Sequence, residues 1–392
     1  MAAARFGRAS EVLVAGSSLL ESVPLIDHHC HGVTFAELGA AQFDELASES
    51  SAPGRPGRML AASQFGAVVR AECAPLLGLP RHCGSEEYQA RRLELGAAEV
   101  NRRLLVATGI SCYFIDTGYR GGELLTVEQM AEASGQSARE VVRLEAVAEE
   151  LVRSDVSAAG FALAYAGALA KAAHGAVGLK SIMAYRFGLD FDPDRPAPRD
   201  VTRAAGDWLR RCTQSGQTRL DDPVLLRHIL WAGVDLGLPL QFHVGFGDSD
   251  IVLHRCDPAR MTAFIQAVQP LGTQVMLLHC YPYHRQAGYL AHVYPHVWFD
   301  TGSAVSHSGL GSLQLIRESL EVAPFDKVLF STDAFGLAEL YLCGALLWRR
   351  GLAQLMDEWL ARDWLSAGDA ERFAVMMAHG NARRAYGLED HS

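Results

Sequence analysis

PLIDHHCHGV (Pro24–Val33) places one aspartate and three histidines directly after a short apolar run that is typical of a buried strand. Burying imidazole rings without partners costs free energy, because each ring carries polar nitrogen atoms. His29 and His31 are two residues apart, so their side chains face the same side of a strand. We therefore expect this strand to end at a site where the two histidines bind something.

Length and composition limit the classes of protein to consider. Of the 392 residues, 49% are hydrophobic and 20% are charged, which is enough apolar material for a large core. The 35 basic and 45 acidic residues give a formal charge of −10, which argues against a nucleic-acid groove because such a groove needs a basic stripe. The apolar run at residues 158–173 is interrupted by Lys171, so no membrane span is predicted.

The cysteines and the first residues bear on the cellular compartment. Eight cysteines are scattered without CxxC pairs, a pattern that predicts reduced thiols and a cytoplasmic location. Residues 1–23 contain an apolar patch that Arg8 and Glu11 interrupt. This pattern favours an amphipathic helix over a signal peptide.

Short apolar segments alternate with longer helical segments along the chain. The predicted strands are Leu25–His29, Ser111–Asp116, Val141–Leu144, Ala176–Ile182, Leu240–Val244, Val275–His279, Val297–Phe299 and Val328–Ser331. The predicted helices include Ser157–Ala173, Pro223–Leu236, Pro258–Gln269, Ser312–Leu320 and Ala338–Trp348. Eight β-then-α units predict an α/β fold, a (β/α)₈ barrel of the TIM type.

The positions of the polar residues favour this barrel over an open sheet. They fall at or just beyond the carboxyl ends of the predicted strands, namely His29, His31, Lys180, His243, His279 and Asp333. All strand ends of a barrel converge on one mouth, where barrel enzymes build their sites. In an open sheet the same side chains would be spread along one edge.

The segment between the first two predicted strands is too long for one connection. We interpret residues 35–105 as a helical insertion that covers the barrel mouth and excludes water, with a solvated surface subdomain as the alternative. About two dozen residues precede the first strand, so no flanking β-sandwich is expected. Residues 1–392 are predicted to form a single domain.

Several of these segments resemble those of the amidohydrolase superfamily. DHHCH at residues 27–31 resembles the strand-one HxH motif, and LQFHVG, MLLHCYP and LFSTDA resemble the segments that carry the strand-five His, the strand-six His and the strand-eight Asp. The finer resemblance is to the amidohydrolase-2-like domain found beside glutamine synthetase in FluG- and nodulin-type proteins. It rests on GLKSIMAYRFGLD, QFHVGFGDSDI, LLHCYPYHRQAGYLA and HGNARRAYGL, and it covers residues 22–388.

The chemistry of these side chains predicts a metal centre independently of the resemblance. Zinc and similar divalent ions bind neutral imidazole and carboxylate, and a catalytic site keeps one position open for water. We predict His29, His31 and His243 as ligands of Zn²⁺ or Mn²⁺, with Asp333 as a further ligand or as the acceptor of a proton from activated water. His279 is predicted to assist the substrate carbonyl or to bind a second ion.

Three further residues, Lys180, His28 and Asp27, flank this set. Binuclear members of the superfamily carry a carbamylated strand-four lysine, so the resemblance implies that Lys180 contacts either the metal centre or the substrate. A buried ion pair is the alternative for this lysine. His28 points away from His29 and is interpreted as structural, whereas Asp27 is a candidate to fix a histidine tautomer.

Other polar residues near the predicted mouth are candidates for substrate binding. Tyr185 and Arg186 offer a handle for a substrate carboxylate, because guanidinium binds carboxylate in a bidentate fork. A surface pair of Arg186 with a nearby aspartate, residue 190 or 192, is the alternative. The loop GFGDSDI, whose glycines indicate a tight turn, supplies Asp248 and Asp250 either to bind a substrate amine or to solvate the loop. Further candidates at the mouth are Tyr281 and His284.

The residues and the resemblance together predict a metal-dependent hydrolase of a C–N bond in a small, carboxylate-bearing molecule. An amide such as a γ-glutamyl or N-acyl amino compound is the expected substrate, the γ-glutamyl part by analogy with the family alone. The first alternative is a nonoxidative metal-dependent decarboxylase, and the second is a barrel scaffold without turnover. A homodimer is the default expectation, since the apolar stretch at residues 340–356 suits either an interface or a core helix.

Overall fold

The computed structural model describes residues 20–388 except residue 53. Most of the amphipathic helix predicted for residues 1–23 therefore lies outside the described residues.

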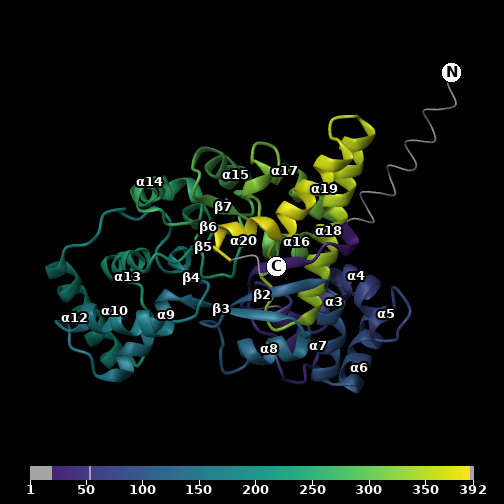
Figure 1. Ribbon diagram of the computed structural model, residues 1–392. Coiled ribbons are helices and arrows are strands. Elements are labelled where there is room, and N and C mark those ends of the chain that lie inside the picture. The colour runs from purple at the N-terminus through teal and green to yellow at the C-terminus, as the bar shows by residue number, and fades with distance from the viewer. Residues whose placement is uncertain (1–19, 53, 389–392) are drawn as a thin grey trace.

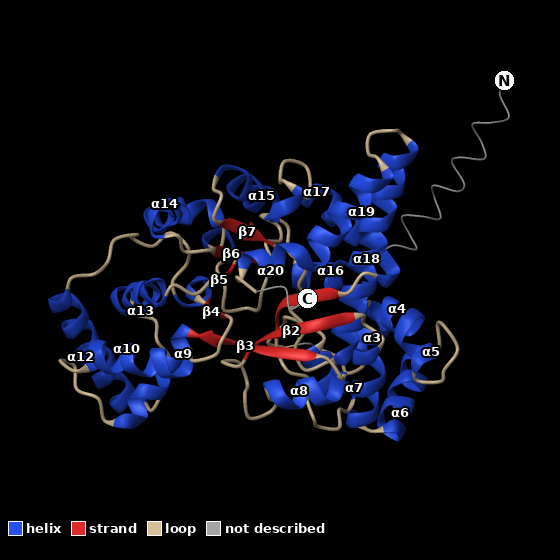
Figure 2. Ribbon diagram, in the orientation of Figure 1, coloured by secondary structure: helices blue, strands red, loops and turns tan. Residues whose placement is uncertain are grey.

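A sheet of seven parallel strands forms the centre of the fold. The strands are β1 (Leu25–Cys30), β2 (Ile110–Asp116), β3 (Ser137–Arg143), β4 (Gly178–Ser181), β5 (Leu240–His243), β6 (Val275–Leu278) and β7 (Val297–Phe299). Each strand pairs in parallel with the next one along the chain, so that the spatial order is the sequence order. Figure 2 shows these strands in the middle of the molecule with helices around them. The sheet curls into a half-barrel, so the predicted α/β fold is confirmed but the closed eight-stranded barrel is confirmed only in part.

The segment predicted as the eighth strand, Val328–Ser331, is not confirmed as a regular strand. It makes a single parallel bridge, between Val328 and Phe299 of β7. On its other side, the backbone N–H of His28 in β1 donates to the carbonyl of Phe330 at 3.1 Å. The segment thus hydrogen-bonds to β7 and β1 with an irregular backbone.

Helices connect and surround the strands. Those between β1 and β2 are α2 (Ala40–Leu46), α3 (Arg58–Ala62), α4 (Gln64–Val68), α5 (Ala74–Leu76), α6 (Ser85–Leu95) and α7 (Ala97–Val106). Those from β2 to β5 are α8 (Val127–Ser134), α9 (Leu144–Leu151), α10 (Phe161–Ala172), α11 (Met183–Arg186), α12 (Pro198–Ser215) and α13 (Pro223–Leu236). The later ones are α14 (Thr262–Val268), α15 (His284–Val293), α16 (Gly302–Ser308), α17 (Ser312–Ser319), α18 (Ala338–Ala361), α19 (Ala367–Val375) and α20 (Asn381–Ala385). In the described residues no second sheet accompanies the barrel strands.

Most of the region predicted as a lid, residues 35–105, packs against the side of the fold. Helix α7 contacts α18, and the two lie on the same flank in Figure 1. Arg92 of α6 donates from Nε to Glu339 of α18 at 2.9 Å, and both side chains are buried. This ion pair holds the later part of the 35–105 region against α18. Only the early part of the region, around α2, can lie at the carboxyl ends of the strands.

Helix α18 contains the apolar stretch at residues 340–356, for which the sequence left open a dimer interface or a core helix. Its apolar side chains Leu340, Leu342, Leu352 and Leu355 are buried, and the helix packs against α16 and α17. The stretch is therefore a core helix in this structure, and the homodimer stays a prediction.

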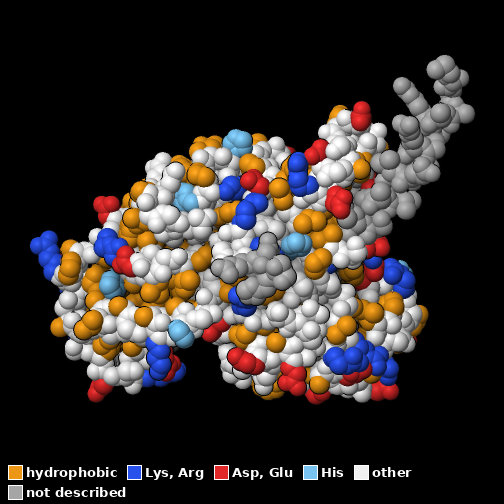
Figure 3. Space-filling model, viewed as in Figure 1, with side chains coloured by type: hydrophobic (Ala, Val, Ile, Leu, Met, Phe, Trp, Pro, Cys, Tyr) orange, Lys and Arg blue, Asp and Glu red, His pale blue; other side chains and the backbone are white. Residues whose placement is uncertain are grey.

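Surface and thiol chemistry agree with the composition. The eight cysteines are free and buried. Within residues 20–388 no helix is both long and apolar enough to cross a bilayer. On the face shown in Figure 3, basic and acidic side chains are interspersed, without a continuous basic stripe.

Candidate metal centre

Two histidines and one carboxylate meet at the carboxyl end of the sheet. His29 and His31 lie at the end of β1, and Asp333 follows the irregular segment beside it. One ligand atom from each of the three lies within 4.8 Å of the others. Asp333 Oδ1 is 3.2 Å from Nε2 of His29 and 3.7 Å from Nε2 of His31. The structure thus brings together the HxH pair and the aspartate that sequence places about 300 residues away.

His243 and His279 border this group from the ends of β5 and β6. Nδ1 of His279 is 3.2 Å from Oδ2 of Asp333, and the His279 and His243 ring centroids are 4.7 Å apart. Nε2 of His243 is buried and has no hydrogen-bond partner among the described residues. His243, the predicted third ligand, therefore lies next to the compact group of three and outside it, with a nitrogen atom left unpaired.

The Nδ1 atoms of both HxH histidines have hydrogen-bond partners. Nδ1 of His31 is 3.0 Å from the backbone carbonyl of Asp116, at the end of β2. Nδ1 of His29 is 2.8 Å from Oε1 of Gln241 in β5. A carbonyl oxygen only accepts, so Nδ1 carries the hydrogen in each ring and Nε2 presents its lone pair. Neither Gln241 nor Asp116 was among the residues that the sequence singled out.

The two other polar residues of the DHHCH motif do not contact the group. Asp27, the candidate for fixing a tautomer, instead accepts hydrogen bonds from the backbone N–H and the hydroxyl of Thr332, at 2.9 and 2.5 Å. That contact anchors the segment before Asp333. His28 contacts Asp300 and the hydroxyl of Tyr386, each at 2.9 Å, and lies outside the group of three, which agrees with a structural role.

Backbone strain is concentrated at the site. His279, Cys280 and Asp333 have φ angles of 69°, 45° and 50°, in the left-handed region that non-glycine residues rarely adopt. Such conformations persist only where surrounding contacts hold them. Here Asp300 Oδ1 accepts from the backbone N–H of His279 at 2.9 Å. The strained backbone places the side chains of His279 and Asp333 against each other.

Lys180 lies beside the histidines at the end of β4. Its Nζ is 3.3 Å from Nε2 of His29, and only 2% of the residue is exposed. Burial lowers the pKa of this lysine to about 8. The structure therefore places Lys180 in direct contact with a predicted ligand.

The electrostatics of the group favour neutral imidazole rings, the form that binds a metal ion. Burial lowers the pKa of His31 to about 4, and it lowers the pKa of His29, His243 and His279 well below the usual histidine value. Burial also raises the pKa of Asp333 well above its usual range. Neutral imidazoles with a carboxylate are a donor set that suits zinc or a similar divalent ion, and the unpaired nitrogen of His243 adds a further donor.

A cavity of about 420 Å³ opens from this group to the surface. Tyr185, Arg186 and Asp248 line it, as the sequence predicted. The early part of the 35–105 region contributes Glu45 and residues 48–51, so a short segment of the predicted lid does border the mouth.

Arg186 presents part of its guanidinium to the cavity. Its Nη2 is 3.0 Å from Oε1 of Glu149, and its Nε is buried without a hydrogen-bond partner among the described residues. The alternative pairing of Arg186 with a nearby aspartate is wrong, because Asp190 pairs with Arg255 and Asp192 pairs with Arg227.

The two glycines in the loop after β5 lie very close to neighbouring residues, which leaves no room for a side chain. Gly245 has a φ of 69°, and a Cβ there would lie 2.2 Å from the carbonyl oxygen of Tyr281. A Cβ on Gly247 would lie 2.2 Å from the hydroxyl of Tyr185. The glycines thus allow the loop to pass close to Tyr281 and Tyr185, and the loop brings Asp248 to the cavity.

Two predicted substrate-binding residues lie away from the cavity, which corrects that prediction. The rings of Tyr281 and His284 stack on each other with centroids 6.1 Å apart. His284 is the first residue of α15, and its Nε2 contacts Glu318 of α17 at 2.9 Å. Neither side chain lines the cavity, and that of His284 contacts α17 instead.

Three residues that sequence reasoning missed line the cavity, namely Glu49, Tyr119 and Arg143. Arg143 ends β3 and donates to Asp116 at 2.6 Å. Its position at a strand end is a detectable signal, but the strand was predicted to start four residues late and to end one residue late, at Leu144, so Arg143 did not stand at the predicted end. Glu49 lies beyond α2, and no local motif marks it.

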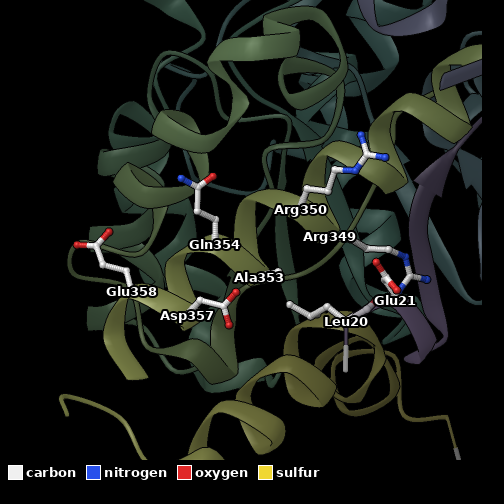
Figure 4. Close-up of a pocket in the computed structure, with 8 residues that line it drawn as sticks. All are labelled: Leu20, Glu21, Arg349, Arg350, Ala353, Gln354, Asp357 and Glu358. Atoms are coloured by element: carbon white, nitrogen blue, oxygen red, sulfur yellow. Dashed lines mark hydrogen bonds between the residues drawn. The ribbon is translucent and has the colours of Figure 1, made fainter. Parts of the chain in front are cut away.

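A second cavity, of about 560 Å³, lies along α18 and is shown in Figure 4. It is lined by Leu20, Glu21, Arg349, Arg350, Ala353, Gln354, Asp357 and Glu358. None of the predicted site residues borders it. We therefore assign the chemistry to the smaller cavity at the strand ends.

Comparisons with known proteins agree with this geometry. A family model described as Amidohydrolase matches residues 129–388. The chain is 26% identical over 410 residues to Protein fluG of Emericella nidulans; the match covers 95% of this chain and 46% of that protein, so the chain spans about half of its length.

Solved structures are similar over nearly the whole chain. A proposed metal-dependent hydrolase of Lactobacillus casei has a TM-score of 0.83 and 27% identity, with 95% of this chain and 97% of that chain covered. A uronate isomerase of Bacillus halodurans has a TM-score of 0.63 and 14% identity, with 98% of each chain covered. The isomerase shows similarity of fold alone.

Proposed function

This chain belongs to the amidohydrolase family, and from that premise we propose that it is a metal-dependent hydrolase of a C–N bond. The proposed substrate is an amide of a small carboxylate-bearing molecule, such as a γ-glutamyl or N-acyl amino compound. The observation that carries the proposal is the group of His29, His31 and Asp333 at the base of a cavity.

The site residues would divide the work between holding an ion and moving a proton. His29, His31 and His243 would hold one divalent ion, Zn²⁺ or Mn²⁺, with Asp333 beside it. Such an ion polarises a carbonyl group and activates water near neutral pH. Asp333 would accept a proton from the attacking water and return it to the leaving nitrogen. His279, in contact with Asp333, would assist at the substrate carbonyl oxygen.

The rest of the cavity suits a substrate with a carboxylate. The unpaired Nε of Arg186 supports carboxylate binding, with Tyr185 as its neighbour. Asp248, on the loop after β5, would bind a substrate amine. Lys180 would contact the substrate, or, if a second ion is bound, would serve as its carbamylated ligand.

A decarboxylase is the second candidate function, because the same carboxylate-binding residues would hold the group that leaves as CO₂. Assaying a panel of γ-glutamyl amides and N-acyl amino acids for released ammonia or amine tests the first candidate. We expect release from at least one compound, and expect a chelator to abolish it. If no amide is cleaved while an aromatic or aliphatic carboxylic acid releases CO₂, the hydrolase proposal is wrong and the decarboxylase replaces it.

Arg186→Gln is expected to raise the KM for a carboxylate-bearing substrate by about 10- to 100-fold, with a smaller effect on kcat, because a charged hydrogen bond is lost. Arg195→Gln is the matched control, since Arg195 pairs with Asp235 on the surface. Steady-state kinetics of both variants measure KM and kcat. An unchanged KM in Arg186→Gln would exclude this arginine from substrate binding.

A further inference from the structure

A continuous chain of buried hydrogen bonds links the last helix to a predicted metal ligand. Nε2 of His28 contacts Asp300 Oδ2 at 2.9 Å, and Nδ1 of the same ring contacts the hydroxyl of Tyr386 at 2.9 Å. That hydroxyl is 2.7 Å from Nε2 of Gln241. Oε1 of Gln241 is in turn 2.8 Å from Nδ1 of His29. The function proposed above uses only the last member of this chain.

The donors and acceptors along the chain have one consistent assignment. The backbone carbonyl of His28 only accepts, and it lies 2.8 Å from the Gln241 amide, so the nitrogen of that amide faces it. The same nitrogen donates its second hydrogen to the Tyr386 oxygen. Tyr386 then donates its own hydrogen to Nδ1 of His28, whose Nε2–H donates to the Asp300 carboxylate.

This assignment leaves Oε1 of Gln241 facing His29 as an acceptor. Nδ1 of His29 must then carry the hydrogen, and Nε2 presents its lone pair toward Asp333. Rotating the amide by half a turn would direct its oxygen at the His28 carbonyl, which only accepts, and the Tyr386 hydroxyl could donate to that oxygen only by giving up its bond to Nδ1 of His28. The amide would also then donate to Nδ1 of His29 and move the ring hydrogen to Nε2, where it would block coordination.

The ring of Tyr386 is held firmly enough to act in this way. It follows α20 directly, is buried, and packs edge-on against Phe114 of β2 with ring centroids 4.9 Å apart. Its carbon atoms also lie close to Gly178, where an added Cβ would be 3.1 Å from Cε1 of the ring. A rigid ring keeps the hydroxyl fixed between Gln241 and His28.

We infer that Tyr386 is a positioning residue, which orients the Gln241 amide and thereby holds His29 in the tautomer that can coordinate a metal ion. The inference rests on the proposed function in that it concerns the same metal site. The inference gives the Tyr386 hydroxyl a role at that site. Tyr386 follows the last described helix, and its hydroxyl does not touch the group of His29, His31 and Asp333.

The test replaces the tyrosine and follows both the tautomer and the metal. Tyr386→Phe is compared with Tyr165→Phe, which removes a buried hydroxyl that bonds to the carbonyl of Leu144 outside this chain. The His29 tautomer is read by ¹⁵N nuclear magnetic resonance of histidine-labelled, metal-free protein, with the signal assigned by its loss in His29→Ala. Zinc affinity is measured by competition with a chromophoric chelator.

We expect Tyr386→Phe to populate the Nε2–H tautomer of His29 and to weaken zinc binding by about 10-fold, at the lower end of the range for residues that support metal ligands. Tyr165→Phe should change neither. Normal tautomer and affinity in Tyr386→Phe, or an equal loss in Tyr165→Phe, would overturn the inference.

The same substitution made in a Gln241→Glu variant separates a positioning role of Tyr386 from a general loss of structure. Gln241→Glu, protonated on the oxygen that faces the His28 carbonyl, keeps an accepting oxygen toward His29 and so holds the hydrogen on Nδ1 of His29 whether or not the tyrosine hydroxyl is present. The 10-fold effect of Tyr386→Phe should therefore disappear in the Gln241→Glu background. The same factor in both backgrounds would contradict positioning through Gln241. If wild-type protein binds no zinc, the proposed function fails, whereas the tautomer measurement still decides this inference.

Discussion

Asp333→Asn is expected to lower kcat by about 10²- to 10⁴-fold, because asparagine keeps the shape of the side chain but cannot accept the proton. Asp333 Oδ2 lies 3.2 Å from His279, and Oδ1 lies 3.2 Å from His29, so the carboxylate is in reach of both the predicted metal and the substrate carbonyl. The measurement is turnover of the best amide found in the panel.

Asp363→Asn is a matched control for this prediction. Asp363 also has a positive φ, of 57°, but lies exposed after α18. Its replacement should leave kcat unchanged. Loss of turnover with metal retained would assign Asp333 to proton transfer, and loss of both would assign it to metal binding. Turnover of Asp333→Asn within about twofold of wild type would remove the proposed base.

The double variant His29→Ala/His31→Ala is expected to reduce the metal content from about one ion per chain to less than about 0.1, and to abolish turnover. Two of the three members of the compact ligand group are removed, and Asp333 and His243 alone leave too few donors to retain zinc. Plasma mass spectrometry of the purified proteins measures the content.

His174→Ala/His254→Ala controls for the removal of two histidines, since both of these side chains are exposed. It should keep the wild-type metal content. Two ions per wild-type chain would place Lys180 among the ligands as a carbamylated bridge. An unchanged metal content in His29→Ala/His31→Ala would show that the ion binds elsewhere.

The HxH motif and the alternation of strands predicted side chains that the structure brings together at the carboxyl end of the sheet. Parallel strands in sequence order bring their carboxyl ends toward one mouth when the sheet curls, and His29, His243 and His279 lie close together there. The eighth strand could not be predicted correctly, because the backbone of that segment is irregular and turns into the left-handed region at Asp333. Its hydrogen bonds to Asp27 and to β1 hold it in place.

The residues that support the ligands left no local signal in the sequence. Gln241 and Tyr386 contact each other across 145 positions of the chain, and only the folded structure brings them together. Closeness in sequence also led to a wrong placement of His284. It follows His279 by five residues, but it begins α15 and does not line the cavity. Zinc as the metal, the cytoplasmic location and the homodimer stay predictions.

The central claim is that one divalent ion binds between β1 and the segment that carries Asp333. An anomalous difference map, collected from crystals of the metal-loaded protein at the absorption edge of the bound element, tests this claim most directly. We predict a peak in contact with His29, His31 and Asp333, with His243 alongside. A map with no peak there, although the crystals contain the metal, would contradict the account.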